Sequence, residues 1–131
     1  MKVKTDTKEK FHAITVETDL LSANMAAELS TQVLPILQAS NRNVVMNMSE
    51  VRAIDDSAAE QLVKLQQAFY EKEASFVFCE LTPEVEAFLD ATDLLEIINV
   101  TPTESEAWDI VQMEEIEREL LGDDPADENT A

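Results

Sequence analysis

The stretch that decides the fold is VVMNMSEVRAIDDSAAEQLVKLQQAF, residues 44–69. It opens with a short apolar run that is β-branched at Val44 and Val45, which is typical of a strand buried on both faces. From Ala58 to Phe69, apolar residues recur every three or four positions, which predicts an amphipathic helix. A buried strand followed at once by a helix favours a parallel sheet covered by helices.

The same alternation continues on both sides of this stretch. Strands are predicted at residues 2–5, 11–16, 43–49, 75–81 and 97–100. Helices are predicted after Ser22 or Asn24, over residues 58–72, after Thr82 and after Thr103, each of which is a residue type suited to a helix start. The order β-β-α-β-α-β-α-β-α predicts an α/β domain with a mixed, mostly parallel sheet and about four helices.

The last helix carries apolar residues along its whole length. We expect the following residues to face inward: Ala107, Ile110, Val111, Met113, Ile116, Leu120 and Leu121. Gly122 is expected just past the end of this helix, because glycine suits that position. The domain is therefore predicted to span residues 1–121. Residues 122–131 have no apolar anchor and are expected to form an acidic, disordered tail.

Composition excludes several classes of function. The chain has 131 residues, about one domain's worth, and 28 acidic against 9 basic residues give it a net charge of −19. We therefore expect no binding to nucleic acid or to an anionic membrane, because both need basic surface. There is no apolar run of the roughly 20 residues that a membrane span requires, and the start, MKVKTDTKEK, lacks a signal-peptide core.

The single cysteine and the single glycine exclude further classes of protein. The single cysteine, Cys79, cannot form an internal disulfide and fits a reducing compartment, so a cytoplasmic protein is expected. The single glycine, Gly122, excludes glycine-rich phosphate loops and dinucleotide fingerprints. No nucleophile is paired with a base, and Cys79 has no basic neighbour to activate it, so we expect no enzyme activity, cofactor or metal. The sequence leaves open whether the chain is a monomer or a weak dimer.

Ser57 is the residue of most interest, and it has two interpretations. With Glu60 it forms a Ser-x-x-Glu box, which predicts that its side chain caps the helix that follows. Alternatively, Ser57 is a phosphorylation switch, because a helix start tolerates a phosphate and the added charge would repel an acidic group on a partner. Both interpretations place the Ser57 hydroxyl at the mouth of the helix.

The same stretch resembles the STAS domain family, of the anti-sigma factor antagonist type. That family typically shows an apolar strand ending in Asp-Leu-Ser, followed by Asp-Ser-Ser-Gly or Asp-Ser-Thr-Gly at a helix start. Here Asn47-Met48-Ser49 matches the first element and Asp55-Asp56-Ser57-Ala58 the second. The later Thr92-Asp93-Leu94 is similar to a Thr-Gly-Leu turn of the family. Asn47, Asp56 and Ala58 depart from the family pattern.

The resemblance implies a bacterial partner-switching regulator. In that family the unmodified protein binds an anti-sigma factor or a serine kinase-like ATPase, and phosphorylation releases the partner. By position, the acceptor is Ser57. We expect the partner-binding surface to lie around it; the residues assigned to that surface are Asp55, Asp56, Ala58, Glu60, Gln61 and Lys64.

Three other classes of protein share some of these features. A STAS domain can also act without phosphorylation, as a docking subunit of a larger complex such as a lipid-transport ATPase. Asp56-Ser57-Ala58 is close to the motif of an acyl carrier protein, but those proteins are all-helical, whereas strands are predicted here. A response-regulator receiver would need a lysine after a late strand, and no lysine or arginine occurs between Lys72 and Arg118.

Overall fold

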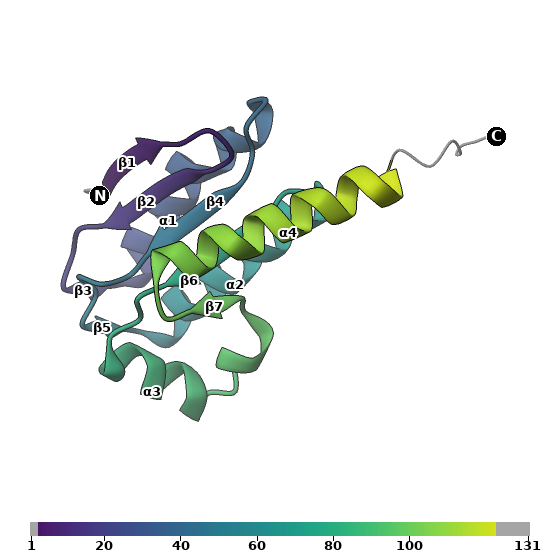
Figure 1. Cartoon of the computed structure of the whole chain (residues 1–131). Coiled ribbons are helices and arrows are strands. Elements are labelled where there is room, and N and C mark those ends of the chain that lie inside the picture. The colour runs from purple at the N-terminus through teal and green to yellow at the C-terminus, as the bar shows by residue number, and fades with distance from the viewer. Residues whose placement is uncertain (1–2, 123–131) are drawn as a thin grey trace.

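The computed structural model describes residues 3–122, which form a five-stranded main sheet with helices on both faces and a second, two-stranded sheet (Figure 1). The predicted order of elements is confirmed, with two short strands and two 3-10 turns added. The helices are α1 (Ala23–Val33), α2 (Asp56–Glu71), α3 (Pro83–Ala91) and α4 (Glu104–Gly122), and the 3-10 turns are η1 (Leu34–Gln38) and η2 (Leu95–Ile97). The strands are β1 (Val3–Thr7), β2 (His12–Val16), β3 (Leu20–Leu21), β4 (Val44–Asn47), β5 (Ala53–Ile54), β6 (Phe76–Cys79) and β7 (Val100–Thr101).

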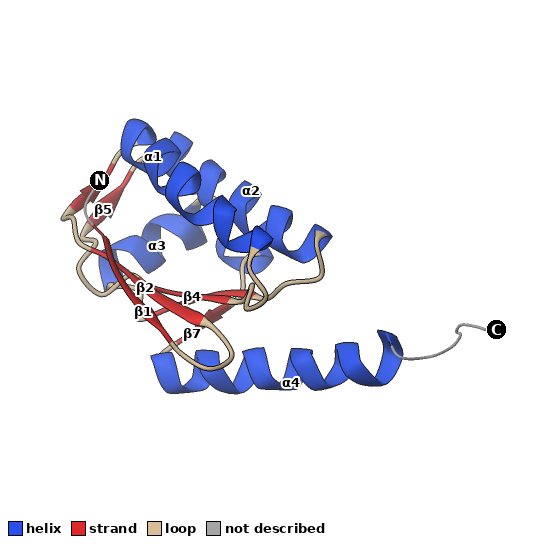
Figure 2. Cartoon of the chain, turned by 90° about the horizontal axis from the view of Figure 1, so that it is seen from above, coloured by secondary structure: helices blue, strands red, loops and turns tan. Residues whose placement is uncertain are grey.

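The main sheet has the strand order β1-β2-β4-β6-β7. β1 and β2 form an antiparallel hairpin in which Val3 lies opposite Val16, and every other neighbouring pair is parallel. Helices α1, α2 and α3 cover one face, and α4 lies on the other (Figure 2). The predicted α/β class and the mixed, mostly parallel sheet are therefore confirmed.

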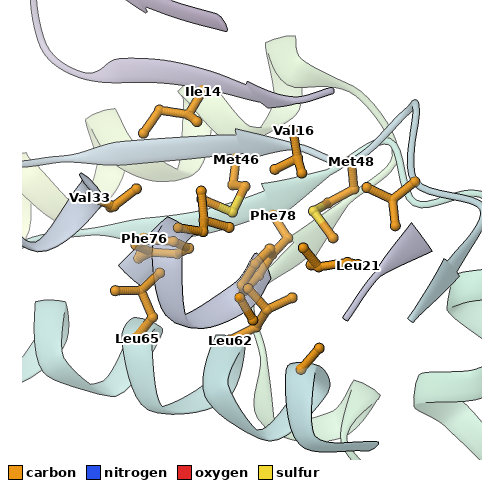
Figure 3. Packing of buried hydrophobic residues seen from close by; sticks show 14 of the residues in the cluster. Ile14, Val16, Leu21, Val33, Met46, Met48, Leu62, Leu65, Phe76 and Phe78 are labelled. Carbon is orange, nitrogen blue, oxygen red and sulfur yellow. The ribbon is translucent and has the colours of Figure 1, made fainter. Parts of the chain in front are cut away.

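The sheet divides the core into two layers of unequal size. Successive side chains of a strand point to opposite faces, so Met46 and Phe78 enter the large layer beneath α1, α2 and α3, while Val45 and Val77 enter the small layer beneath α4. In the large layer Phe76 contacts Phe78, with ring centroids 5.1 Å apart (Figure 3). The small layer also holds Cys79, which is buried as a core residue.

The second half of α4 turns a different set of residues toward the sheet from the set that was predicted. Ala107 and Val111 are buried, and Trp108 packs on Phe11 with ring centroids 5.0 Å apart. The four residues that follow in the predicted apolar face are exposed instead: Met113, Ile116, Leu120 and Leu121. The predicted inward direction of those four residues is wrong, because polar residues of α4 occupy the side that faces the sheet.

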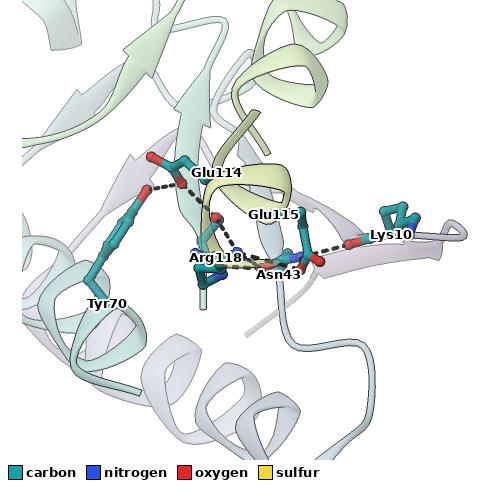
Figure 4. A network of polar contacts seen from close by, with 7 residues as sticks. Lys10, Asn43, Tyr70, Glu114, Glu115 and Arg118 are labelled. Atoms are coloured by element: carbon teal, nitrogen blue, oxygen red, sulfur yellow. Dashed lines mark hydrogen bonds and ion pairs between the residues drawn. The ribbon is translucent and has the colours of Figure 1, made fainter. Parts of the chain in front are cut away.

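Those polar residues form a network with the amino-terminal ends of the strands (Figure 4). Tyr70 donates its hydroxyl to Glu114 Oε1 at 2.8 Å, and Asn43 Nδ2 donates to Glu115 Oε2 at 2.7 Å. Arg118 Nη2 donates to Asn43 Oδ1 at 3.2 Å. Burial, and then the hydrogen bond to Glu114, raise the pKa of Tyr70 above its ordinary value, which keeps the phenol protonated as a donor. The second half of α4 is thus held to the sheet by hydrogen bonds.

Two helices end in left-handed residues that are not glycine. After α2, Glu73 has φ 60°, and Ala74 N–H donates to Phe69 O at 2.9 Å. After α3, Asp93 has φ 62°, and Leu94 N–H donates to Leu89 O at 2.9 Å. These are Schellman motifs, in which glycine is the usual left-handed residue. Asp93 stands in the turn that resembles the Thr-Gly-Leu of the STAS family, so its conformation explains why glycine suits that place.

Two smaller predictions need correction. Only Val100 of the strand predicted over residues 97–100 lies in β7, and Ile97 closes the turn η2 instead. Gly122 is the last residue of α4 rather than the first one past it. From Asp123 onward, the predicted acidic tail lies outside the described residues. No helix among residues 3–122 is long and apolar enough to cross a membrane.

Candidate partner-binding site at the start of α2

The chain between β4 and α2 is fixed at both ends and in its middle. Asn47 Oδ1 accepts the backbone N–H of Ser49 at 2.9 Å, which turns the chain as it leaves β4. Val51 is buried, and its carbonyl accepts the hydroxyl of Thr82 at 2.8 Å. Ala53 and Ile54 then form β5, which pairs in parallel with β3. The candidate site therefore follows a segment that hydrogen bonds and strand pairing hold in place, and it does not lie on a free loop.

Asp55, and not Ser57, caps α2. Its Oδ1 accepts the N–H of Ala58 at 2.7 Å, and its backbone is extended, with φ −94° and ψ 170°, as expected of an N-cap residue. The capping role predicted for Ser57 is therefore wrong. The physical reason is that β5 ends at Ile54, so the helix begins directly after Asp55 and Ser57 lies already inside its first turn.

The same carboxylate also binds the start of α1. Asp55 Oδ2 accepts the N–H of Ala23 at 3.2 Å, while Gln61 Nε2 donates to the carbonyl of Ala23 at 3.0 Å. α1 has its own N-cap in Ser22, whose hydroxyl accepts the N–H of Met25 at 3.4 Å. The starts of α1 and α2 are thus joined through Ala23, a contact between distant segments that sequence reasoning missed.

Ser57 is exposed as the second residue of α2. The side chains of Asp55, Asp56 and Glu60 are also exposed, so the surface around Ser57 is acidic, and Lys64 adds one exposed cation farther along the helix. The structure therefore places Asp55, Asp56, Ser57, Glu60 and Lys64 together, at the start of α2 and along its exposed side.

Two of the predicted partner-binding residues serve the fold instead. Ala58 is fully buried, so its side chain cannot reach a partner and its assignment to the surface is corrected. Small, apolar Ala58 packs in the large layer of the core with Leu62. Gln61 is half-buried, and its amide is engaged by Ala23. The exposed part of the predicted surface is therefore Asp55, Asp56, Ser57, Glu60 and Lys64, which we call the α2 surface.

Within residues 3–122, no group of three or more His, Cys, Asp or Glu side chains could hold a metal ion. Burial, followed by the nearby charges of Glu104 and Glu80, raises the pKa of the Cys79 thiol to about 12, so this thiol is not a nucleophile near neutral pH.

The fold and this surface define a small α/β domain whose second helix opens on an exposed serine. The model of the STAS domain family matches residues 2–107, so the chain belongs to the STAS domain family. The resemblance stated from the sequence is confirmed. No match is found among curated protein sequences.

Solved structures of the same fold come from several organisms. TM1081 of Thermotoga maritima, a proposed anti-sigma factor antagonist, is 19% identical over 84% of this chain and 94% of that one, with a TM-score of 0.71. The phosphorylated form of the Bacillus cell fate determinant SpoIIAA is 13% identical over 84% of this chain and 99% of that one, with a TM-score of 0.61. The mouse anion transporter Slc26a9 is 15% identical over 79% of this chain and 18% of that one, with a TM-score of 0.67.

Proposed function

We propose that the chain is a cytoplasmic, non-enzymatic protein-binding regulator of the anti-sigma factor antagonist type, switched by phosphorylation of Ser57. Its partner would be an anti-sigma factor or a serine kinase-like ATPase that docks on the α2 surface. The observation that carries the proposal is that Ser57 is exposed in the first turn of α2 while Asp55 supplies the cap. The hydroxyl is therefore available for modification without loss of the cap.

A phosphate on Ser57 would change charge more than structure. The positive end of the helix dipole favours an anion in the first turn, so the modified helix can remain folded. Phosphorylation adds about −1.5 to −2 charges at neutral pH to a surface that already exposes Asp55, Asp56 and Glu60. The modified surface would consequently repel any acidic group of a docked partner.

The size of this repulsion is sufficient for a switch. Two like unit charges about 5 Å apart repel by roughly 1–3 kcal/mol at effective dielectric constants between that of water and 20. One such pair alone weakens binding by about fivefold to somewhat more than a hundredfold, and a second pair weakens it further. The existence of a phosphorylated SpoIIAA with this fold supports the view that the scaffold accepts the modification.

The test is to incubate the chain with ATP and a serine kinase of the anti-sigma factor type, and to map the modified residue by mass spectrometry. We expect phosphate on Ser57 and none in Ser57→Ala. Ser105 provides a matched control, because it is likewise the exposed second residue of a helix, between Glu104 and Glu106. Ser105→Ala should be modified like the wild type, and modification that persists in Ser57→Ala would refute the assignment.

Partner binding tests the switch itself. Ser57→Asp should bind the docked partner more weakly than the wild type, whereas Ser105→Asp should bind it equally well.

The second candidate function is a STAS docking subunit that works without phosphorylation, such as a subunit of a lipid-transport ATPase. It is favoured by the presence of this fold within the larger Slc26a9 transporter. Equal partner binding by the wild type, Ser57→Ala and Ser57→Asp would select that second function.

A further inference from the structure

The outer face of α4 carries an apolar stripe. Met113, Ile116 and Leu120 are 59%, 56% and 74% exposed. They follow one another at spacings of three and four residues, so they lie in one row along the helix. This row, which we call the outer stripe, is on the side of α4 that points away from the sheet, opposite Ala107 and Val111. Spacing of this kind is what a second helix packs against.

The outer stripe has no role in holding α4 to the sheet. Ala107 and Val111 make the apolar contact in the first half of the helix, and Glu114, Glu115 and Arg118 make the polar contact in the second half. α4 lies by itself on its face of the sheet within residues 3–122, so the stripe is open to a partner along its length (Figure 2). Exposed apolar residues in a row, beyond what folding uses, mark an interaction surface.

Charge decides what kind of partner fits. The stripe is bordered by exposed acidic residues: Glu106, Asp109, Glu117 and Glu119. The one cation of α4 is Arg118, which is turned to the sheet, where it donates to Ser75 Oγ at 3.0 Å. A second copy of α4 would bring acidic borders against acidic borders, and an anionic lipid surface would be repelled in the same way. A helix with basic borders would be attracted.

We propose that the outer stripe binds a basic amphipathic helix of another protein. Apolar side chains of that helix would cover Met113, Ile116 and Leu120, and its lysines or arginines would lie beside the acidic borders. This site is on the opposite face of the sheet from α2, so it is independent of Ser57 and of the proposed switch (Figure 2).

The test uses a synthetic peptide of leucine and lysine, about five helical turns long, with its leucines along one face. A peptide of the same composition, with its leucines spread around the helix, controls for charge alone. We expect the first peptide to bind the full chain at least tenfold more tightly than the second, as measured by fluorescence anisotropy at physiological salt.

Two double variants locate the binding on the chain. Ile116→Gln/Leu120→Gln should weaken binding of the amphipathic peptide at least tenfold, with an unchanged circular dichroism spectrum. Leu34→Gln/Ile97→Gln, which replaces two exposed apolar residues outside α4, should bind like the wild type. Ser57→Asp should also bind like the wild type, so failure of the switch and failure of this site are distinguishable.

Three results would overturn the proposal. The first is equal binding of the two peptides, which would mean that charge alone acts. The second is equal binding by Ile116→Gln/Leu120→Gln and the wild type. The third is a dimer of the peptide-free chain in sedimentation velocity that the same double variant abolishes, because the occupant of the stripe would then be a second copy.

Discussion

The Asp55 carboxylate lies 3.2 Å from the N–H of Ala23, and so serves the first turn of α1 as well as that of α2. The first N–H groups of a helix have no partner within the helix, and here one side chain satisfies a group in each of two helices. Asp55 is therefore needed for the shape of the α2 surface before any partner arrives.

Asp55→Ala should lower the free energy of unfolding by about 1–2 kcal/mol, because an N-cap is lost. Asp55→Asn should lose less, since asparagine also caps helices. Urea denaturation measures both values. Asp56→Ala is the matched control, because Asp56 is the neighbouring exposed carboxylate and is not the cap. An equal loss in Asp55→Ala and Asp56→Ala would contradict the capping role.

Ser57→Ala should change the free energy of unfolding by no more than about 0.5 kcal/mol, because Ser57 is exposed and does not cap the helix. Ser22→Ala should cost about 1 kcal/mol, since the Ser22 hydroxyl caps α1. The comparison is made by urea denaturation of both variants. A large loss in Ser57→Ala would return the capping role to Ser57 and would weaken its use as a switch.

Glu73→Gly and Asp93→Gly should each stabilise the fold, by up to about 1 kcal/mol, because a left-handed conformation strains residues that have a Cβ atom. Thermal unfolding measures the gain. Gln67→Gly serves as the control, since Gln67 is exposed in the middle of α2, where glycine should cost about 1 kcal/mol. Destabilisation by all three glycines would show that the left-handed positions are not strained.

Acid should weaken the fold through Glu115. Its hydrogen bond from Asn43 is the main cause that lowers the pKa of this carboxyl below the ordinary value of 4.5, and Arg118 adds to the effect. A lowered pKa in the folded state means that the stabilisation is complete above the unfolded value and is lost as pH falls through the folded value.

Glu115→Gln should therefore lose less stability than the wild type between about pH 6 and pH 3. Glu119→Gln, one turn farther along and exposed, should follow the wild type. Urea midpoints at several pH values measure the difference. Parallel curves for the wild type and Glu115→Gln would show that the Asn43–Glu115 contact does not contribute.

Cys79 should not react with thiol reagents near neutral pH while the chain is folded. The thiol is buried in β6, and its pKa is raised to about 12, so the thiolate is scarce. Ellman's reagent should label the chain only in denaturant. Rapid labelling of the folded chain would mean that the small layer beneath α4 opens readily.

Most strands of the main sheet, and the order of strands and helices along the chain, could be predicted because the longer elements have clear apolar patterns. The strand predicted over residues 11–16 shows this, because Ile14 and Val16 enter the large layer of the core while Phe11 and Ala13 enter the small one. The order of the strands within the sheet was not predicted. The pair of β3 and β5 could not be predicted, since two residues such as Leu20 and Leu21 show no period. His12 is half-buried, because β2 is an internal strand that pairs with both β1 and β4.

The position of the candidate site along the chain was predicted, but the roles of Asp55 and Ser57 within it were not. Asp55 and Ser57 are both good cap residues, and a pattern cannot fix a helix start to within two residues. The direction of Met113 and Ile116 was wrong because an apolar period shows which residues share a face, but not what covers that face. Here Asn43, Ser75 and Tyr70 hold α4 from distant parts of the chain, which no local pattern reveals.

The sheet lies between α2 and α4, and this arrangement has a consequence for assembly (Figure 2). Two ligands bound by these helices would sit on opposite sides and would not compete for space. The domain would then be a connector, able to release one neighbour when Ser57 is modified while the other stays tethered.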